Sequence, residues 1–260
     1  MTELMGFLSR ISWGLPMHWM RSHVWAVLGV ALLEVLGSSG SLDGEAQEEW
    51  GAKRSAKKVM PLGDSITQGA AGHASYRCQL WWKLTSSGYR ADFVGTLSTG
   101  YLGANTCSSL WFDRDHEGHW SWRADQVLAN ISNWAASTHP DLVLIHLGTN
   151  DTYHEQTEDS TVSELEQIID RLRVVNPRVK VFLAQVIPTS GAMLSLKLQS
   201  LNQRMPSLAA AKSTEASPVY VVDQWTGFNP ATDTYDGIHP NLLGEEKMAE
   251  RWSQAIREHL

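Results

Sequence analysis

The chain has 260 residues, of which 43% are hydrophobic and 19% charged, values typical of a globular protein with one large domain or two small ones. Its net charge of -7 argues against nucleic acid as a partner, because phosphate binding needs clustered lysine and arginine side chains. The composition therefore predicts a sizeable core and excludes DNA and RNA binding.

The first 41 residues differ in composition from the rest. Residues 24–33 are an apolar run that follows Arg21 and precedes the small residues 37–41. A short basic region, an apolar region and a small-residue exit are the pattern of a secretory signal peptide. The run is short for a membrane span and Glu34 interrupts its extension, although a signal anchor is the alternative. Residues 1–41 thus predict a secreted, extracellular protein without stable membrane association after cleavage.

A polar segment, residues 42–56, follows the predicted signal. It contains the dibasic pair Lys53 and Arg54 shortly before the first predicted strand. This pattern predicts a pro-segment that is cut after Arg54, with a polar linker as the alternative. The folded domain then spans residues 57–260.

The remaining sequence alternates between strand and helix patterns. Apolar runs predict five strands, at residues 59–62, 92–95, 142–147, 179–187 and 219–222. Helical spacing predicts five helices, at residues 76–84, 124–136, 162–174, 194–211 and 244–259. The third strand is apolar without interruption, which is typical of a central parallel strand covered on both faces. We therefore predict an α/β fold: a three-layer sandwich with a five-stranded parallel sheet of flavodoxin-like order, 2-1-3-4-5, and helices on both faces.

Cys78 and Cys107 are the only cysteines. In an exported protein an even pair favours one disulfide, and two buried free thiols are the alternative. Two cysteines at this separation do not make a zinc site.

Ser65 lies directly after the first predicted strand, in the sequence MPLGDSIT at residues 60–67. In open parallel sheets, ligands bind beyond the carboxyl ends of the strands. A serine in this position is a candidate nucleophile. The alternative is that Gly63, Asp64 and Ser65 form an ordinary turn.

Three further polar residues follow later strands. Asp236 and His239 are three positions apart, so on a single helical turn the carboxylate reaches one ring nitrogen and leaves the other free to take a proton from Ser65. A turn with a surface histidine is the alternative. Asn150, after the third strand, is the natural donor to a developing oxyanion.

The segment 113–119 contains two histidines and three acidic residues, side chains that often bind metals. Zinc and calcium sites use defined ligand sets with other spacings, so we predict no metal here. His146 lies inside an apolar strand and is expected to be a core histidine with satisfied hydrogen bonds.

Taken together, the motifs resemble those of the SGNH (GDSL-like) hydrolases, because GDSIT, GTND and DGIH occur in the order of that superfamily. The more detailed resemblance is to carbohydrate esterase family 3, the acetylxylan esterases, and to the fungal members in particular. The matching segments are MPLGDSIT at 60–67, SYR at 75–77, DFVG at 92–95, HEGH at 116–119, GTND at 148–151, VD at 222–223 and DTYDGIHPN at 233–241. The resemblance covers roughly residues 58 to 258.

The resemblance implies the role of each candidate residue. It assigns Ser65 as nucleophile, His239 as base and Asp236 as the acid that orients the base. The oxyanion donors it implies are the backbone N–H of Ser65, the side chain of Asn150 and the backbone N–H at position 121. The family has a glycine at this last position, whereas this chain has Ser121, which still has an N–H but tolerates fewer backbone conformations.

The resemblance also implies a function: a secreted serine esterase that deacetylates plant cell-wall polysaccharide, namely acetylated xylan, without a cofactor and as a monomer. Trp111, Trp120 and Tyr235 are candidates to stack on sugar rings, and core packing is the alternative for each. Two other functions stay open, a lipid or thioester hydrolase on the same fold and a carbohydrate-binding relative that has lost activity. The serine at position 121 is the strongest argument for the second of these.

Overall fold

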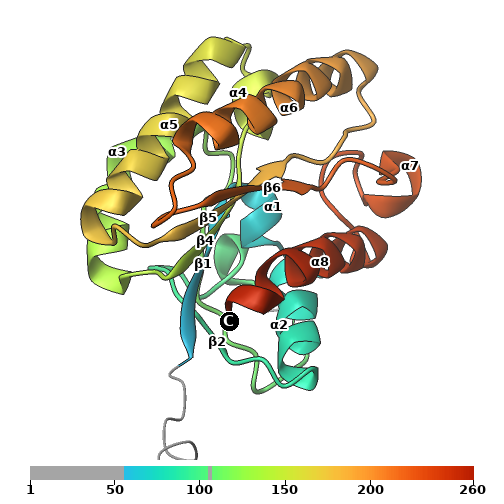
Figure 1. The fold of residues 1–260 in the computed structure, drawn as a ribbon. Helices are drawn as coiled ribbons and strands as arrows, with labels where there is room; N and C mark the ends of the chain where they lie inside the picture. Colours follow the sequence, from blue (N-terminus) through green and yellow to red (C-terminus); the bar gives the residue numbers. More distant parts are fainter. Residues whose placement is uncertain (1–55, 105–106) are drawn as a thin grey trace, which may run out of the picture. The chain divides into compact units, whose positions relative to one another are not determined.

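A parallel β-sheet forms the centre of the structure (Figure 1). The computed structural model describes residues 56–104 and 107–260. Its strands are β1 (Lys57–Gly63), β2 (Ala91–Phe93), β3 (Glu117–Gly118), β4 (Leu142–His146), β5 (Lys180–Gln185) and β6 (Val219–Asp223). The five main strands are parallel and follow the order β2-β1-β4-β5-β6, which confirms the predicted flavodoxin-like order.

Helices cover both faces of this sheet. The helices of the described residues are α1 (Ser65–Gln68), α2 (Tyr76–Ser86), α3 (Ala124–Thr138), α4 (Thr149–Tyr153), α5 (Glu158–Val175), α6 (Ala192–Lys212), α7 (Pro230–Asp233) and α8 (Leu242–Ile256). Short 3-10 turns lie at Tyr101–Gly103 and Arg257–His259. Helices α3, α5 and α6 lie on one side of the sheet and α2 and α8 on the other, so the predicted three-layer sandwich is confirmed (Figure 1).

Strand β4 shows why the layers form. All five of its residues are buried, and they alternate between two cores. Val143 and Ile145 pack on the side of α3, α5 and α6, whereas Leu142 and Leu144 pack on the side of α2 and α8. Full burial of such a side chain contributes roughly 1.5–3 kcal/mol, so an uninterrupted apolar strand is most stable between two helical layers.

Helix α5 illustrates how local sequence fixes an element. Thr157 caps its first turn by accepting a hydrogen bond from the Ser160 N–H, as expected for a threonine at this position. Leu165, Ile169 and Leu172 form part of its buried stripe. The cap explains why the helix begins at Glu158, four residues before the predicted start.

The long loop after β2 contains a strand that was not predicted. In β3, Glu117 pairs with Leu62 and Gly118 with Gly63, at the carboxyl end of β1. Two residues are too few to show a strand pattern, so this pairing could not be predicted from the sequence. It places the loop directly beside Ser65.

A disulfide joins Cys78 of α2 to Cys107 in the same loop, which confirms the predicted pairing. Closing a loop of about 30 residues stabilises a protein by roughly 3–4 kcal/mol on the chain-entropy model. The bond therefore holds the loop against the helix layer that contains α2.

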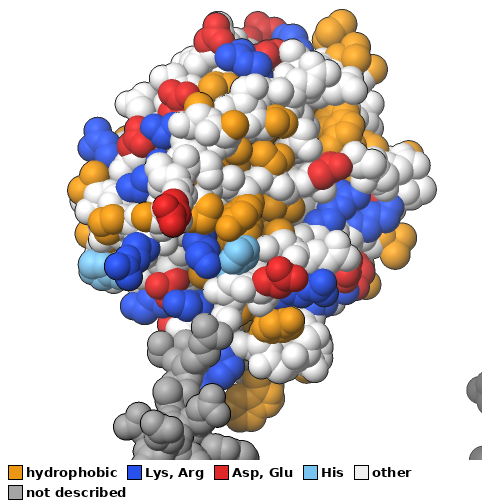
Figure 2. All heavy atoms as spheres, in the orientation of Figure 1, with side chains coloured by type: hydrophobic (Ala, Val, Ile, Leu, Met, Phe, Trp, Pro, Cys, Tyr) orange, Lys and Arg blue, Asp and Glu red, His pale blue; other side chains and the backbone are white. Residues whose placement is uncertain are grey.

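The surface shows intermixed charges. On the face seen in Figure 2, basic and acidic side chains are interspersed. Within residues 56–104 and 107–260, none of the helices has the length and apolar character needed to cross a membrane. The predicted signal, residues 1–41, and all but the last residue of the predicted pro-segment, 42–56, lie outside the described residues.

Candidate active site

Ser65 lies where β1 turns into the short helix α1. Asp64 caps this helix, since its Oδ1 accepts a hydrogen bond from the Ile66 N–H at 2.9 Å. A side chain at Gly63 would meet the Thr67 hydroxyl and the His146 carbonyl, so only glycine fits at the end of the strand. Ser65 thus sits at the carboxyl edge of the sheet, as predicted, and at the amino-terminal end of a short helix that was not predicted.

His239 bridges Ser65 and Asp236. Its Nε2 lies 2.9 Å from the Ser65 Oγ, and its Nδ1 lies 2.7 Å from the Asp236 Oδ2. Partial burial raises the pKa of Asp236, but hydrogen bonds from the backbone and ring of His239 and from the Ile238 N–H outweigh it and lower the pKa below its ordinary value. A hydroxyl, an imidazole and an ionised carboxylate in one hydrogen-bonded series can transfer a proton from the hydroxyl to the ring.

The predicted helical turn between Asp236 and His239 is wrong. Residues 236–239 form a bend, in which the Asp236 Oδ1 accepts hydrogen bonds from the N–H groups of Ile238 at 3.0 Å and His239 at 2.8 Å. A carboxylate that binds the backbone two and three residues later competes with helix formation. Helix α8 starts only at Leu242, where Asn241 is the cap.

Asn150 contacts Asp64, which precedes Ser65, and Trp122, which follows Ser121. Its Nδ2 donates to the carbonyl of Trp122 at 3.0 Å and lies 3.4 Å from the Asp64 Oδ2. The Trp122 carbonyl can only accept, which fixes the amide with its nitrogen toward the site. Asn150 therefore lies between the turn that contains Ser65 and the loop that contains Ser121.

Asp64 was not predicted to take part in the site. Burial raises its pKa to about 7, and the Asp151 carboxylate adds to this, whereas the hydrogen bond from Ile66 opposes it. The Asp64 Oδ2 lies 3.4 Å from the Asn150 Nδ2, so this buried carboxyl contacts the side chain of a predicted oxyanion donor.

Ser121 adopts the backbone conformation expected of the glycine that it replaces. Its φ angle is 62°, in the left-handed region that residues with a side chain rarely enter. This conformation turns the chain between Trp120, which lies against His239, and Trp122, which stacks on His119 with ring centroids 4.3 Å apart. The substitution is thus accommodated in the backbone at the cost of local strain.

The aromatic residues near His239 contact one another in series. Trp120 stacks on Tyr101, with centroids 4.2 Å apart, and on His239, with centroids 4.9 Å apart. Tyr235 stacks on His73 at 3.9 Å and on His239 at 5.7 Å. Both rings therefore have stacking partners within the protein, although Tyr235 remains 42% exposed.

Trp111 differs from these two residues. Its side chain is 85% exposed, and in the part of the chain that the structure describes it has no ring or hydrogen-bond contact with the Ser65, Asp236 and His239 side chains. Phe112, its neighbour, is buried under the guanidinium of Arg77.

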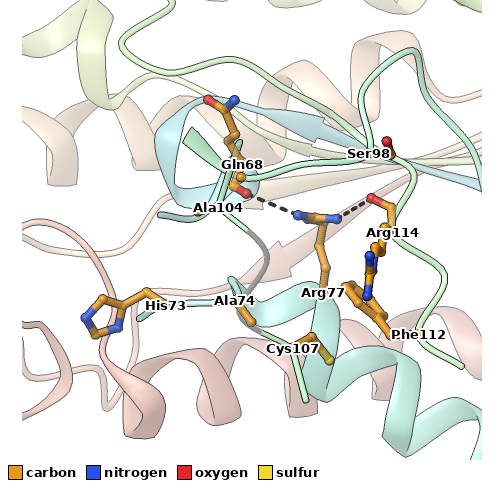
Figure 3. A pocket seen from close by; sticks show the side chains of 10 residues that line it. Gln68, His73, Ala74, Arg77, Ser98, Ala104, Cys107, Phe112 and Arg114 are labelled. Atoms are coloured by element: carbon orange, nitrogen blue, oxygen red, sulfur yellow. Dashed lines mark hydrogen bonds between the residues drawn. The ribbon is translucent and has the colours of Figure 1, made fainter. Parts of the chain in front are cut away.

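Arg77 fixes the backbone that follows Ser65. It is almost fully buried and donates to the carbonyls of Thr67 at 2.8 Å, Gln68 at 3.1 Å and Arg114 at 2.8 Å. Figure 3 shows the guanidinium reaching across a small cavity between Gln68 and Arg114. Because α1 is one turn long, these bonds to its last carbonyls supply order that the helix lacks by itself.

A second small cavity lies beside Ser65 and contains Glu245 of α8. The Glu245 Oε1 accepts a hydrogen bond from the Ser75 N–H at 3.1 Å. Burial raises the pKa of Glu245 to about 7, although the Ser75 hydrogen bond and the charge of Arg77 oppose the shift.

The segment 113–119 uses its acidic and histidine side chains internally. Glu117 accepts hydrogen bonds from Thr96 and from the His119 ring, and the Nδ1 of His116 accepts from the Gly118 N–H. Within residues 56–104 and 107–260, no three such side chains are grouped as metal ligands would be.

His146 is fully buried, as predicted, but the expectation of satisfied hydrogen bonds is wrong. Neither ring nitrogen has a hydrogen-bond partner among the described residues. Burial lowers the pKa of His146 to about 4, which favours the neutral ring. The sequence pattern indicated burial but carried no information about partners.

Comparison with known proteins identifies the family. The sequence pattern of the GDSL-like lipase/acylhydrolase family matches residues 62–247. The chain belongs to this family. Its described part is therefore a carboxylic ester hydrolase domain, in agreement with the resemblance seen in the sequence.

Two solved structures of family 3 carbohydrate esterases are similar to this GDSL-like domain. One, from Talaromyces cellulolyticus, is 32% identical with a TM-score of 0.70, and the match covers 78% of this chain and 97% of that one. The other, from Clostridium thermocellum, is 31% identical with a TM-score of 0.67, and the match covers 78% of this chain and 96% of that one.

A curated relative is the multidomain esterase of Ruminococcus flavefaciens, 29% identical over 78% of this chain. The match covers only 29% of that protein, and a match to another curated relative covers about half of its length. The similarity thus concerns the GDSL-like domain and not the whole of these longer proteins.

Proposed function

We propose that this protein is an exported serine esterase that removes acetyl groups from acetylated xylan. The observation that carries the proposal is the hydrogen-bonded series of Ser65, His239 and Asp236, with distances of 2.9 and 2.7 Å. The similarity to family 3 carbohydrate esterases supports a carbohydrate ester as substrate.

In this proposal the Ser65 Oγ attacks the acetyl carbonyl while the His239 Nε2 takes the hydroxyl proton. Asp236 holds the ring and stabilises the imidazolium that forms. The tetrahedral intermediate then collapses, and the imidazolium protonates the departing sugar oxygen. Water, deprotonated by His239, attacks the acetyl-serine and releases acetate, which restores the free serine.

The negative charge on the intermediate needs donors near Ser65. We assign this role to the N–H groups of Ser65 and Ser121 and to the Nδ2 of Asn150. The bonded position of Asn150 between Asp64 and Trp122 supports its part in this set. Loss of one such donor typically lowers the rate about 100- to 1000-fold.

The substrate is tested by acyl chain length and by leaving group. We expect hydrolysis of p-nitrophenyl acetate to exceed that of p-nitrophenyl octanoate, and we expect acetate release from acetylated xylan. A preference for octanoate without acetate release from xylan would instead indicate a lipid hydrolase. Failure to hydrolyse either p-nitrophenyl ester would indicate a binding protein.

Export is tested separately, because residues 1–55 lie outside the described part of the chain. We expect amino-terminal sequencing of protein from the medium of a secreting host to start at Ser55, after the dibasic pair. A product that still begins at Met1 would contradict cleavage.

A further inference from the structure

A groove lies beside the candidate triad of Ser65, His239 and Asp236. Asp236 and Ile238 form one of its walls. Both residues belong to the bend at residues 236–239, and Asp236 is the triad residue that lines the groove. Ser65 and His239 line the separate small cavity that Glu245 also lines. The other walls of the groove come from the end of α4, the loop that leads into α6 and the first turns of α6, and they include Tyr153, Glu155, Ser190, Met193 and Lys197.

Tyr153 is the exposed aromatic ring of this groove. Its side chain is 62% exposed, and its ring contact is a T-shaped one with His154 at 5.3 Å. Trp120 and Tyr235 differ, because each already stacks on two other rings. Tyr153 is thus the more open ring, since it is 62% exposed against 42% for Tyr235 and its ring contact is edge-on.

The lining of the groove is largely apolar but also has polar groups, the combination that a sugar ring can use. Tyr153 and Met193, which is 68% exposed, provide apolar surface, whereas Ser190 and the pair Lys197–Glu155 provide polar groups at the rim. A sugar ring has an apolar C–H face and an edge of hydroxyl groups, so it can use both kinds of contact. A buried acyl chain would leave the charged pair without a role.

The position of the groove also indicates which part of an ester it receives. In acyl transfer the base that takes the serine proton later gives it to the leaving alcohol, so the alcohol lies next to His239. Asp236 and Ile238 are sequence neighbours of that ring and line the groove. The alcohol part of the substrate, which is the sugar, is thus the part directed toward it.

From these observations we infer that the groove is a sugar-binding subsite and that Tyr153 stacks on a sugar unit next to the acetylated one. This inference rests on the proposed function, since it assumes a carbohydrate ester as substrate. Tyr153 would set the preference for polymeric over simple acetyl esters without touching the reacting atoms.

The kinetic test compares Tyr153→Ala, Tyr153→Phe and wild type on an acetylated xylo-oligosaccharide and on p-nitrophenyl acetate. We expect Tyr153→Ala to lower kcat/KM roughly 3- to 10-fold on the oligosaccharide, mainly through KM, and to leave p-nitrophenyl acetate unchanged. Tyr153→Phe keeps the ring and should match wild type. Trp82→Ala, which removes an exposed ring from the distant helix α2, is the matched control.

Equal effects on both substrates, or none on the oligosaccharide, would overturn the subsite while leaving the esterase assignment intact. A selective loss on p-nitrophenyl octanoate would assign the groove to an acyl chain instead. If wild type proves inactive, calorimetric binding of an unmodified xylo-oligosaccharide to Ser65→Ala and to Ser65→Ala with Tyr153→Ala decides the subsite independently. Equal affinity, or no binding to either protein, would contradict it.

Discussion

Trp120 lies nearly parallel to the imidazole of His239, with ring centroids 4.9 Å apart and an angle of 16° between the planes. The ring of His239 is thus held at its face by Trp120 as well as at both nitrogens by Ser65 and Asp236. The backbone N–H of Trp120 in turn donates to the Gln68 side chain at 2.8 Å, which ties the indole to the end of α1.

This contact predicts that Trp120→Leu weakens catalysis without abolishing it. Leucine keeps the apolar surroundings but removes the aromatic face that orients the ring. We expect kcat/KM on p-nitrophenyl acetate to fall roughly 2- to 10-fold, with the loss mainly in kcat. Trp120→Phe should retain most of the activity. An unchanged kcat in a well-folded Trp120→Leu protein would show that the stacking has no role in the reaction.

The left-handed conformation of Ser121 leads to a second prediction. Glycine enters this region without steric cost, so Ser121→Gly should keep or raise esterase activity and raise the free energy of unfolding by up to about 1 kcal/mol. Ser121→Ala is the matched control, because it removes the hydroxyl but keeps the strain. A large loss of activity in Ser121→Gly would show that the serine side chain itself is needed.

Glu245 predicts a pH-dependent stability. Its folded-state pKa is raised from 4.5 to about 7, so between these values the native protein binds more protons than the unfolded chain. Its contribution to stability is therefore lost as the pH rises through this window. In Glu245→Gln this loss is absent, and the variant should gain stability over wild type between pH 5 and pH 8, on the order of 1–3 kcal/mol.

Urea denaturation at the two pH values measures this gain. Glu215→Gln serves as the matched control, because it makes the same carboxylate-to-amide change at an exposed position. If Glu245→Gln and wild type differ by the same amount at pH 5 and pH 8, the carboxyl does not titrate as expected.

The disulfide gives a prediction about the loop beside Ser65. Replacing Cys78 and Cys107 together with alanine should lower the free energy of unfolding by roughly 2–4 kcal/mol, as measured by urea denaturation under oxidising conditions. Treatment of wild type with a reductant should give a similar loss, while the double variant should not respond to it. A wild type that is insensitive to the reductant would mean that the bond is absent or dispensable.

The order of the main strands could be predicted from the sequence because long apolar runs alternate with helical spacing. Strand β3 could not be predicted, because two residues are too few to show the alternation of buried and exposed side chains that marks a strand. The bend at residues 236–239 was mistaken for a helical turn, because the three-residue spacing of Asp236 and His239 fits both, and only the bonds of the Asp236 carboxylate to the backbone decide between them.

The candidate site, like the fold, could be predicted only in part from the sequence. Ser65, Asn150 and His239 follow strands whose carboxyl ends meet at one edge, so their proximity follows from the topology. Trp120 and Tyr235 each stack on His239. The contact of Trp120 with His239 joins two separate loops, and no local sequence pattern predicts such a contact. Tyr153 was missed although it lies one helical turn beyond Asn150, because a single exposed tyrosine on a short helix has no sequence signature.

The central claim is that Ser65 is the nucleophile of a polysaccharide deacetylase. The most direct measurement is acetate release from acetylated xylan by wild type and by Ser65→Ala, with both proteins shown to be folded. We expect steady release by wild type and a rate at least about 1000-fold lower for the variant, since loss of the nucleophile removes the covalent route. Full activity in Ser65→Ala would contradict the mechanism, and no release by folded wild type would contradict the proposed substrate.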